Sequence, residues 1–134
     1  MVVIDGQGGK IGAQLVEKIR ESGVRGEIFA IGSNSVATAA MMKAGADCGA
    51  TGENPAVVNC RDADFIAGPL GILAADALLG EITPAMAVAV GQSAAQKILL
   101  PVNRCNHYVI GGEDLPLARL VRLAAEKIRE LAET

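Results

Sequence analysis

The chain has 134 residues, a length typical of one domain, and 51% of them are apolar while only 2% are aromatic. A net charge of −3 and the scarcity of aromatic rings argue against a nucleic-acid-binding protein, which needs a basic surface or stacking platforms. Without an apolar run of roughly 18 residues, a signal peptide or a Cys-x-x-Cys pair, the chain is expected to be cytoplasmic and not bound to a membrane.

Strands and helices are predicted to alternate along the chain. Val2-Val3-Ile4 is a continuous apolar run, typical of a central strand that is buried on both faces. After the first glycines, apolar residues recur at helical spacing from Ile11 to Ile19. Taken in order, strands are predicted at residues 2–4, 27–31, 46–50, 64–67, 97–102 and 108–110, and helices at residues 11–22, 36–44, 53–60, 72–79, 84–91 and 117–131.

Residues that start or stop elements refine this pattern. Asn34 or Ser35 is placed to cap the second helix, and Thr83 followed by Pro84 is typical of a helix start. Pro101 predicts that its strand ends early or lies at a sheet edge. The alternation predicts an α/β fold: a three-layer, Rossmann-like, doubly wound and mostly parallel sheet of about five strands, formed by residues 1–134 as a single domain.

A glycine-rich turn lies between the first predicted strand and the first predicted helix. Glycines allow a sharp turn and a close approach of a phosphate, and the helix start offers free N–H groups and a positive dipole end. The turn therefore predicts a phosphate-bearing ligand, and the alternative is a tight turn that needs glycine only for packing. Its members are Gly6, Gln7, Gly8, Gly9, Lys10, Ile11 and Gly12.

The turn departs from the standard dinucleotide fingerprint in three ways. Read from Gly6, the spacing is G-x-G-x-x-x-G, which is one residue too long. Asp5 would repel a pyrophosphate unless a Mg²⁺ ion is bound or the carboxyl is protonated. The second strand is followed by Ser33, Asn34 and Ser35, where an NAD site would have an acid, and these small polar groups tilt the expectation towards NADP.

Four loops are expected to meet at the carboxyl edge of the sheet, where ligands of open α/β sheets bind. They are residues 6–12, 32–35, 68–71 and 103–107, which add Gly68, Pro69, Asn103 and Arg104 to the candidate ligand-binding residues. Cys105 and His107 form the one nucleophile–base combination that the sequence offers, with buried-residue and structural hydrogen-bond roles as the alternatives. Asp76 and Glu81 stand out as acids in or near an apolar stretch, without an assigned role.

Several blocks of the sequence resemble a known family. They are V-I-D-G-Q-G-G-x-I-G, G-S-N-S-x-A-T, A-G-A-D-x-G-A-T-G-E-N, G-P-x-G-I and L-G-E-I-T-P, and together they resemble a family of short bacterial proteins catalogued only as a domain of unknown function. The resemblance covers nearly the whole chain and implies no activity. More distantly, G-Q-G-G-K-I-G is similar to the turn of prephenate-type dehydrogenases, where glycine stands in place of Gln7, which implies a Rossmann-like nucleotide site.

Four functions remain open from the sequence. The first is a nucleotide-binding module or sensor, with NAD or NADP as the expected cofactor. The second is a small enzyme whose site is shared across a subunit interface and uses Asp5, Arg104, Cys105 or His107. The third is a coenzyme A-binding domain, and the fourth is an assembly protein with an apolar surface. A mean hydropathy of +0.36 predicts at least a homodimer.

Overall fold

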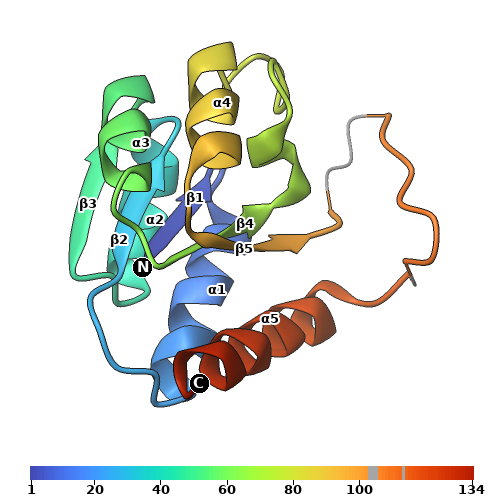
Figure 1. The fold of residues 1–134 in the computed structure, drawn as a ribbon. Helices are drawn as coiled ribbons and strands as arrows, with labels where there is room; N and C mark the ends of the chain where they lie inside the picture. Colours follow the sequence, from blue (N-terminus) through green and yellow to red (C-terminus); the bar gives the residue numbers. More distant parts are fainter. Residues whose placement is uncertain (103–105, 113) are drawn as a thin grey trace.

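The computed structural model of the chain describes residues 1–102, 106–112 and 114–134. Five parallel strands form one sheet in the order β3-β2-β1-β4-β5 (Figure 1). The strands are β1 (Val2–Asp5), β2 (Phe29–Gly32), β3 (Cys48–Thr51), β4 (Phe65–Pro69) and β5 (Gln96–Leu100). The helices are α1 (Lys10–Glu21), α2 (Ser35–Lys43), α3 (Glu53–Cys60), α4 (Pro84–Gln92) and α5 (Leu117–Ala132), with a 3₁₀ helix η1 (Leu70–Leu73).

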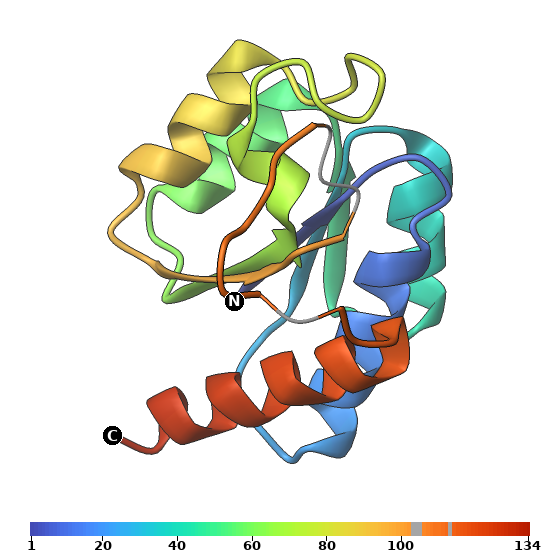
Figure 2. The same cartoon turned by 90° about the vertical axis from the view of Figure 1, so that its right-hand side faces the viewer.

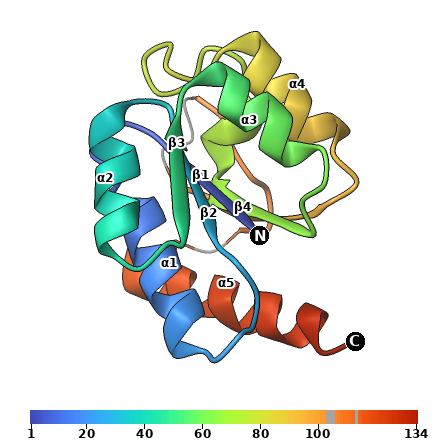
Figure 3. The same ribbon diagram turned by 90° about the vertical axis from the view of Figure 1, so that its left-hand side faces the viewer.

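Helices cover both faces of the sheet. Figure 3 shows α1 and α2 on one side of the strands and α3 and α4 on the other, and α5 packs beside α1 on the first side. The predicted three-layer, Rossmann-like parallel sheet is therefore confirmed. Strand β1 pairs with β2 on one side and with β4 on the other, so the strand order reverses between β1 and β4.

The central strand supplies both halves of the core. Val3 faces the cluster that includes α1 and α5, whereas Val2 and Ile4 face the cluster that includes α3 and α4. All three side chains are at most 2% exposed. A strand between two helical layers has no solvent face, which is why its sequence is continuously apolar and not alternating.

The predicted helix starts agree with the structure. The Asn34 side-chain oxygen accepts the Ala37 amide hydrogen at 2.9 Å and caps α2. The Thr83 hydroxyl oxygen accepts the Met86 amide hydrogen at 3.2 Å and caps α4, with Pro84 as its first residue. Pro101 directly follows β5, which ends at Leu100 and lies at an edge of the sheet, as predicted.

The helix predicted at residues 72–79 is wrong. The chain instead forms the short η1 and then a series of turns, in which Asp76, Leu78 and Leu79 have positive φ angles of 66°, 57° and 57°. These angles are incompatible with a right-handed helix. Individual apolar side chains of the turns are buried, above all Leu78. The hydrophobic periodicity of the sequence cannot distinguish this arrangement from the apolar face of a helix.

The strand predicted at residues 108–110 is also wrong. Tyr108 and Ile110 lie in the connection between β5 and α5 and are 86% and 95% exposed. A short apolar run predicts a strand only when a neighbouring strand can pair with it, and the sheet ends at β5. None of the helices in the described part of the chain is long and apolar enough to cross a lipid bilayer.

Candidate functional site

The turn between β1 and α1 is tight. Its bend is closed by a hydrogen bond from the Gly9 amide to the Gly6 carbonyl at 2.9 Å. Gln7 and Gly9 have positive φ angles of 49° and 74°. Gly9 directly precedes Lys10, the first residue of α1, so the helix begins close to the carboxyl end of β1.

Packing explains three of the four glycines in this turn. A Cβ atom on Gly9 would lie 2.7 Å from the Ala37 Cα atom, and one on Gly12 would lie 2.5 Å from the Met41 sulfur. A Cβ atom on Gly6 would lie 2.4 Å from the Ser33 hydroxyl oxygen. Gly8 differs, since no atom lies within 4 Å of the position that a Cβ atom would take. The packing alternative therefore holds for Gly6, Gly9 and Gly12.

The carboxylate of Asp5 occupies the inner side of the turn. One oxygen accepts the Gly6 amide hydrogen at 2.8 Å and the other accepts the Gly12 amide hydrogen at 2.7 Å. Asp5 is only 3% exposed. These two amides were expected to be free for a ligand, and that expectation is wrong, because the chain supplies its own anion to the start of the helix.

The protonation of Asp5 depends on two opposing effects. Burial raises the pKa of the Asp5 carboxyl, because a buried charge loses its hydration. Hydrogen bonds from the amides of Gly12 and Gly6 lower the pKa, and the negative charge of Glu81 raises it. The net direction is upward, so the folded protein holds the Asp5 proton more tightly than the unfolded chain does.

A second carboxylate closes the outer side of the turn. Oxygen Oε1 of Glu81 accepts three hydrogen bonds, from the Gln7 amide at 2.9 Å, the Ser33 hydroxyl at 2.6 Å and the Asn34 side-chain amide at 2.8 Å. Burial alone would raise the pKa of Glu81, but the three hydrogen bonds outweigh it and hold the pKa below its ordinary value. Glu81 is therefore held as an anion between the first and second loops.

The segment that carries Glu81 crosses the edge of the sheet. Residues 74–83, called the strap below, connect η1 after β4 to α4, and Figure 2 shows this yellow-green segment arching above the sheet. A Cβ atom on Gly6 would lie 2.9 Å from both the Glu81 Oε1 atom and the Leu78 Cδ1 atom. The strap therefore fills the space next to the point where the strand order reverses, which is where open α/β sheets bind ligands.

The structure brings together most of the predicted ligand-binding residues. Ser33 and Asn34 are half-buried beside the turn, and the Asn34 side-chain amide also donates to the Gln7 carbonyl at 2.9 Å. Ser35 is exposed at the start of α2. Gly68 and Pro69 lie within β4 and are buried, so they present no surface to a ligand.

Two amides of the turn remain available. Gln7, Gly8 and Lys10 are exposed, and among the described residues the amides of Gly8 and Lys10 have no hydrogen-bond partner. Ile11 is buried, and its amide helps to lower the pKa of the Asp5 carboxyl. The predicted residues Asn103 and Arg104, and also Cys105, lie outside the described residues.

Glu81 is the candidate site residue whose position the sequence did not reveal. The start of α4 at Thr83-Pro84 was readable and placed Glu81 just before a helix. Its position beside the loops at residues 6–12 and 32–35 depends on the left-handed turns of the strap. Two leucines of the strap have positive φ angles, and a leucine in a sequence does not predict that conformation. Asp76, the other acid that stood out, is exposed to solvent.

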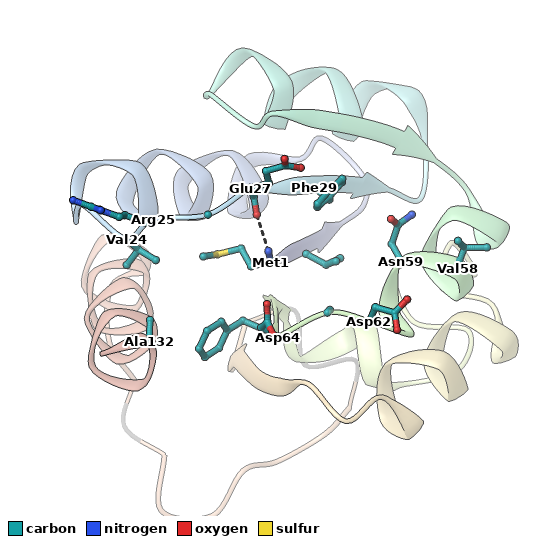
Figure 4. Close-up of a pocket in the computed structure, with 14 residues that line it drawn as sticks. Met1, Val24, Arg25, Glu27, Phe29, Val58, Asn59, Asp62, Asp64 and Ala132 are labelled. Atoms are coloured by element: carbon teal, nitrogen blue, oxygen red, sulfur yellow. Dashed lines mark hydrogen bonds between the residues drawn. The ribbon is translucent and has the colours of Figure 1, made fainter. Parts of the chain in front are cut away.

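A separate hollow of about 460 Å³ lies at the opposite, amino edge of the sheet (Figure 4). Phe29 and Phe65 line it, and the Met1 ammonium donates to the Glu27 carbonyl at 2.6 Å. Its three acids, Glu27, Asp62 and Asp64, outnumber its two cations, Arg25 and the Met1 ammonium, so its charge does not favour a phosphate-bearing ligand. The hollow is separate from the glycine-rich turn, which lies at the carboxyl edge.

Comparison with known proteins gives one match. The model of a family described as "Domain of unknown function (DUF3842)" matches residues 1–133. No curated protein and no solved structure matches the chain.

Proposed function

The chain belongs to the DUF3842 family, as its sequence blocks predicted, and because that family has no described function, we propose from the geometry that the protein is a nucleotide-binding module with NAD or NADP as its ligand. The nucleotide binds at the carboxyl edge, over the turn between β1 and α1. Its phosphates meet the outer side of the turn, because the Asp5 carboxylate already occupies the inner side.

One observation carries this proposal. Three donors from two separate loops, Gln7, Ser33 and Asn34, converge on a single anionic oxygen. Such convergence is the arrangement by which proteins hold phosphate and carboxylate oxygens. The site therefore has the geometry to bind an anion, and the anion that it holds belongs to the chain itself.

The surroundings of these donors favour a phosphate-bearing ligand. Among the described residues the amides of Gly8 and Lys10 have no hydrogen-bond partner, both residues are exposed, and Lys10 adds a positive charge at the surface. The strand order reverses alongside, between β1 and β4, which is the place where open α/β sheets bind ligands and where the strap now lies. A phosphate oxygen can then take the position of the Glu81 Oε1 atom.

A thermal-shift screen tests the proposal. The purified protein is heated with millimolar NAD(H), NADP(H), coenzyme A, ATP or flavin, and a nucleotide that binds the folded state raises the melting temperature. Lys10→Ala should reduce this shift, whereas Lys43→Ala, at the far end of α2, removes the same charge and should leave it unchanged. Absence of any shift, together with no nucleotide released from denatured protein in mass spectrometry, would contradict the proposal.

The same screen separates the coenzyme A alternative. A preference for coenzyme A over NAD(P) would assign the site to that ligand, since both contain a pyrophosphate but differ in the rest of the molecule. The alternative of a small enzyme named Asp5, Arg104, Cys105 or His107. Asp5 is buried and hydrogen-bonded to the turn, His107 is exposed, and Arg104 and Cys105 lie outside the described residues.

A homo-oligomer also remains part of the proposal. The connection between β5 and α5 exposes Tyr108 and Ile110, which are 86% and 95% accessible in the single chain. Exposed apolar side chains that are close in sequence support an association between copies. Sedimentation equilibrium at micromolar concentration tests this, and a monomer under these conditions would contradict it.

A further inference from the structure

The strap contains an unusual run of backbone conformations. Asp76, Leu78, Leu79 and Gly80 have φ angles of 66°, 57°, 57° and 89°, so four of the five residues from 76 to 80 are left-handed. The run forms one left-handed turn, closed by the Gly80 amide donating to the Asp76 carbonyl at 3.0 Å. Leucine is disfavoured in this conformation, because its Cβ atom approaches the following carbonyl oxygen. The strap is therefore strained.

Contacts on both sides of the turn hold the strained backbone in place. The Leu78 side chain is 3% exposed and packs above Gly6, and Ile82 is fully buried. The Asp76 amide donates to the Ile82 carbonyl at 2.7 Å and draws the two ends of the turn together. Leu79 contributes none of this, since its side chain is 96% exposed. Strain that persists without a local benefit is typical of functional sites.

The strained turn places one group that has a chemical role. Glu81 follows it directly and fills the three-donor site made by Gln7, Ser33 and Asn34. These contacts are long-range, since Glu81 lies 74 positions after Gln7 and 48 positions after Ser33. The strap therefore places Glu81 beside hydrogen-bond donors of two other segments, the loops at residues 6–12 and 32–35.

We infer that the strap is an autoinhibitory latch, in which the Glu81 carboxylate holds the site in place of an anionic group of the ligand. This inference rests on the proposed function. The ligand gains access when Glu81 swings out to solvent, and the left-handed turn favours this step because opening releases its strain. The apparent affinity of the site is then its intrinsic affinity multiplied by the fraction of molecules in which the latch is open.

Pyrophosphate binding to three proteins tests the latch. Inorganic pyrophosphate is the probe, because NAD(P) and coenzyme A share this group. Isothermal titration calorimetry compares the wild type with Glu81→Gln, which keeps the size of the side chain but removes its charge. Glu53→Gln is the matched control, since Glu53 is an exposed carboxylate at the start of α3 on the same edge. The Glu81→Gln protein should bind roughly tenfold more tightly than the wild type, and the control should not change.

A second measurement does not depend on a ligand. The Gln7 amide of the wild type should exchange slowly with deuterium, because Glu81 accepts its hydrogen. In Glu81→Ala, which removes the acceptor, it should exchange several-fold faster, while the Gly12 amide, which is bound to Asp5, keeps its rate. Equal Gln7 exchange in the two proteins would overturn the latch contact.

The outcomes separate the latch from the proposed function. Equal pyrophosphate affinity of wild type and Glu81→Gln overturns the latch but leaves a nucleotide site standing. Weaker NADH binding by Glu81→Gln also overturns the latch, since Glu81 then contacts the ribose of the ligand. If neither protein binds pyrophosphate or NADH, both the latch and the proposed function are wrong.

Discussion

The carboxylate of Asp5 accepts the amide hydrogen of Gly12, seven residues further along the chain, at 2.7 Å. This hydrogen bond joins the end of β1 to the first turn of α1, and the second carboxylate oxygen binds the Gly6 amide at 2.8 Å. In a dinucleotide site a ligand phosphate satisfies the amides at this helix start. Here a side chain satisfies them, so the turn is stable without a ligand on its inner side.

Replacing Asp5 should destabilise the protein. Asp5→Ala leaves the buried amides of Gly6 and Gly12 without an acceptor, and we expect a loss of about 2–3 kcal/mol in the free energy of unfolding. Asp5→Asn keeps one acceptor and should lose less. Urea unfolding followed by circular dichroism measures both. An Asp5→Ala protein as stable as the wild type would contradict the assigned role.

The same carboxyl predicts a pH dependence of stability. Its pKa is raised in the folded protein from an ordinary value of 3.8, so the folded state binds this proton more tightly than the unfolded chain. The stabilisation is complete below pH 3.8 and is lost as the pH rises through the raised pKa. Asp5→Asn does not titrate, so the stability of the wild type relative to this variant should fall across that window. Urea unfolding of the two proteins over a pH series provides the test. A wild type that becomes more stable relative to Asp5→Asn as the pH rises would show that the pKa of Asp5 is lowered and not raised.

The two neighbouring glycines of the turn should respond very differently to alanine. Gly9→Ala introduces a Cβ atom 2.7 Å from the Ala37 Cα atom at a residue with a φ angle of 74°, and we expect a loss of about 2–4 kcal/mol. Gly8→Ala meets no atom within 4 Å and should change stability by less than about 0.5 kcal/mol. Chemical denaturation of the pair is its own control. Similar losses in both variants would show that packing against α2 does not explain Gly9.

Relieving the strain at Leu79 should stabilise the protein. The side chain is 96% exposed, so Leu79→Gly removes no buried contact, and glycine adopts a φ angle of 57° without a Cβ clash. We expect a gain of about 0.5–1 kcal/mol, seen as a higher melting temperature in calorimetry. Leu79→Ala is the control, because alanine keeps a Cβ atom and therefore the left-handed strain, so this variant should show no gain. Leu73→Gly is not a suitable control, because Leu73 lies in η1. A loss of stability in Leu79→Gly would contradict the strained conformation.

Two cysteines should differ in reactivity towards alkylating reagents. Cys60 is 1% exposed, and burial raises the pKa of its thiol to about 11, which leaves almost no thiolate at neutral pH. Cys48 is exposed at the start of β3. Iodoacetamide should therefore label Cys48 in the native protein and Cys60 only after denaturation, and peptide mass spectrometry distinguishes the two. Rapid native labelling of Cys60 would be inconsistent with the described core.

The sequence alone determined the order of the elements and the architecture that they form. Apolar runs such as Val2–Ile4 need burial on both faces, and helical periodicity such as that of α1 needs burial on one, so both patterns are local and readable. The caps at Asn34 and Thr83 were readable for the same reason, since a capping side chain acts on an amide three residues away. The predictions for residues 72–79 and 108–110 failed because burial there depends on segments that are distant in sequence. The turns after η1 bury single side chains such as Leu78, and no neighbouring strand pairs with residues 108–110.

Only the tertiary structure decided what the glycine-rich turn holds. The turn and its position between strand and helix followed from the sequence, but whether its amides are free depends on which groups the fold brings to them. Asp5 is adjacent in sequence, yet it reaches Gly12 only through the turn, and Glu81 reaches Gln7 across 74 residues. Hydrogen-bond donors are satisfied by whatever acceptor lies nearest in space, and nearness in space is a property of the folded chain.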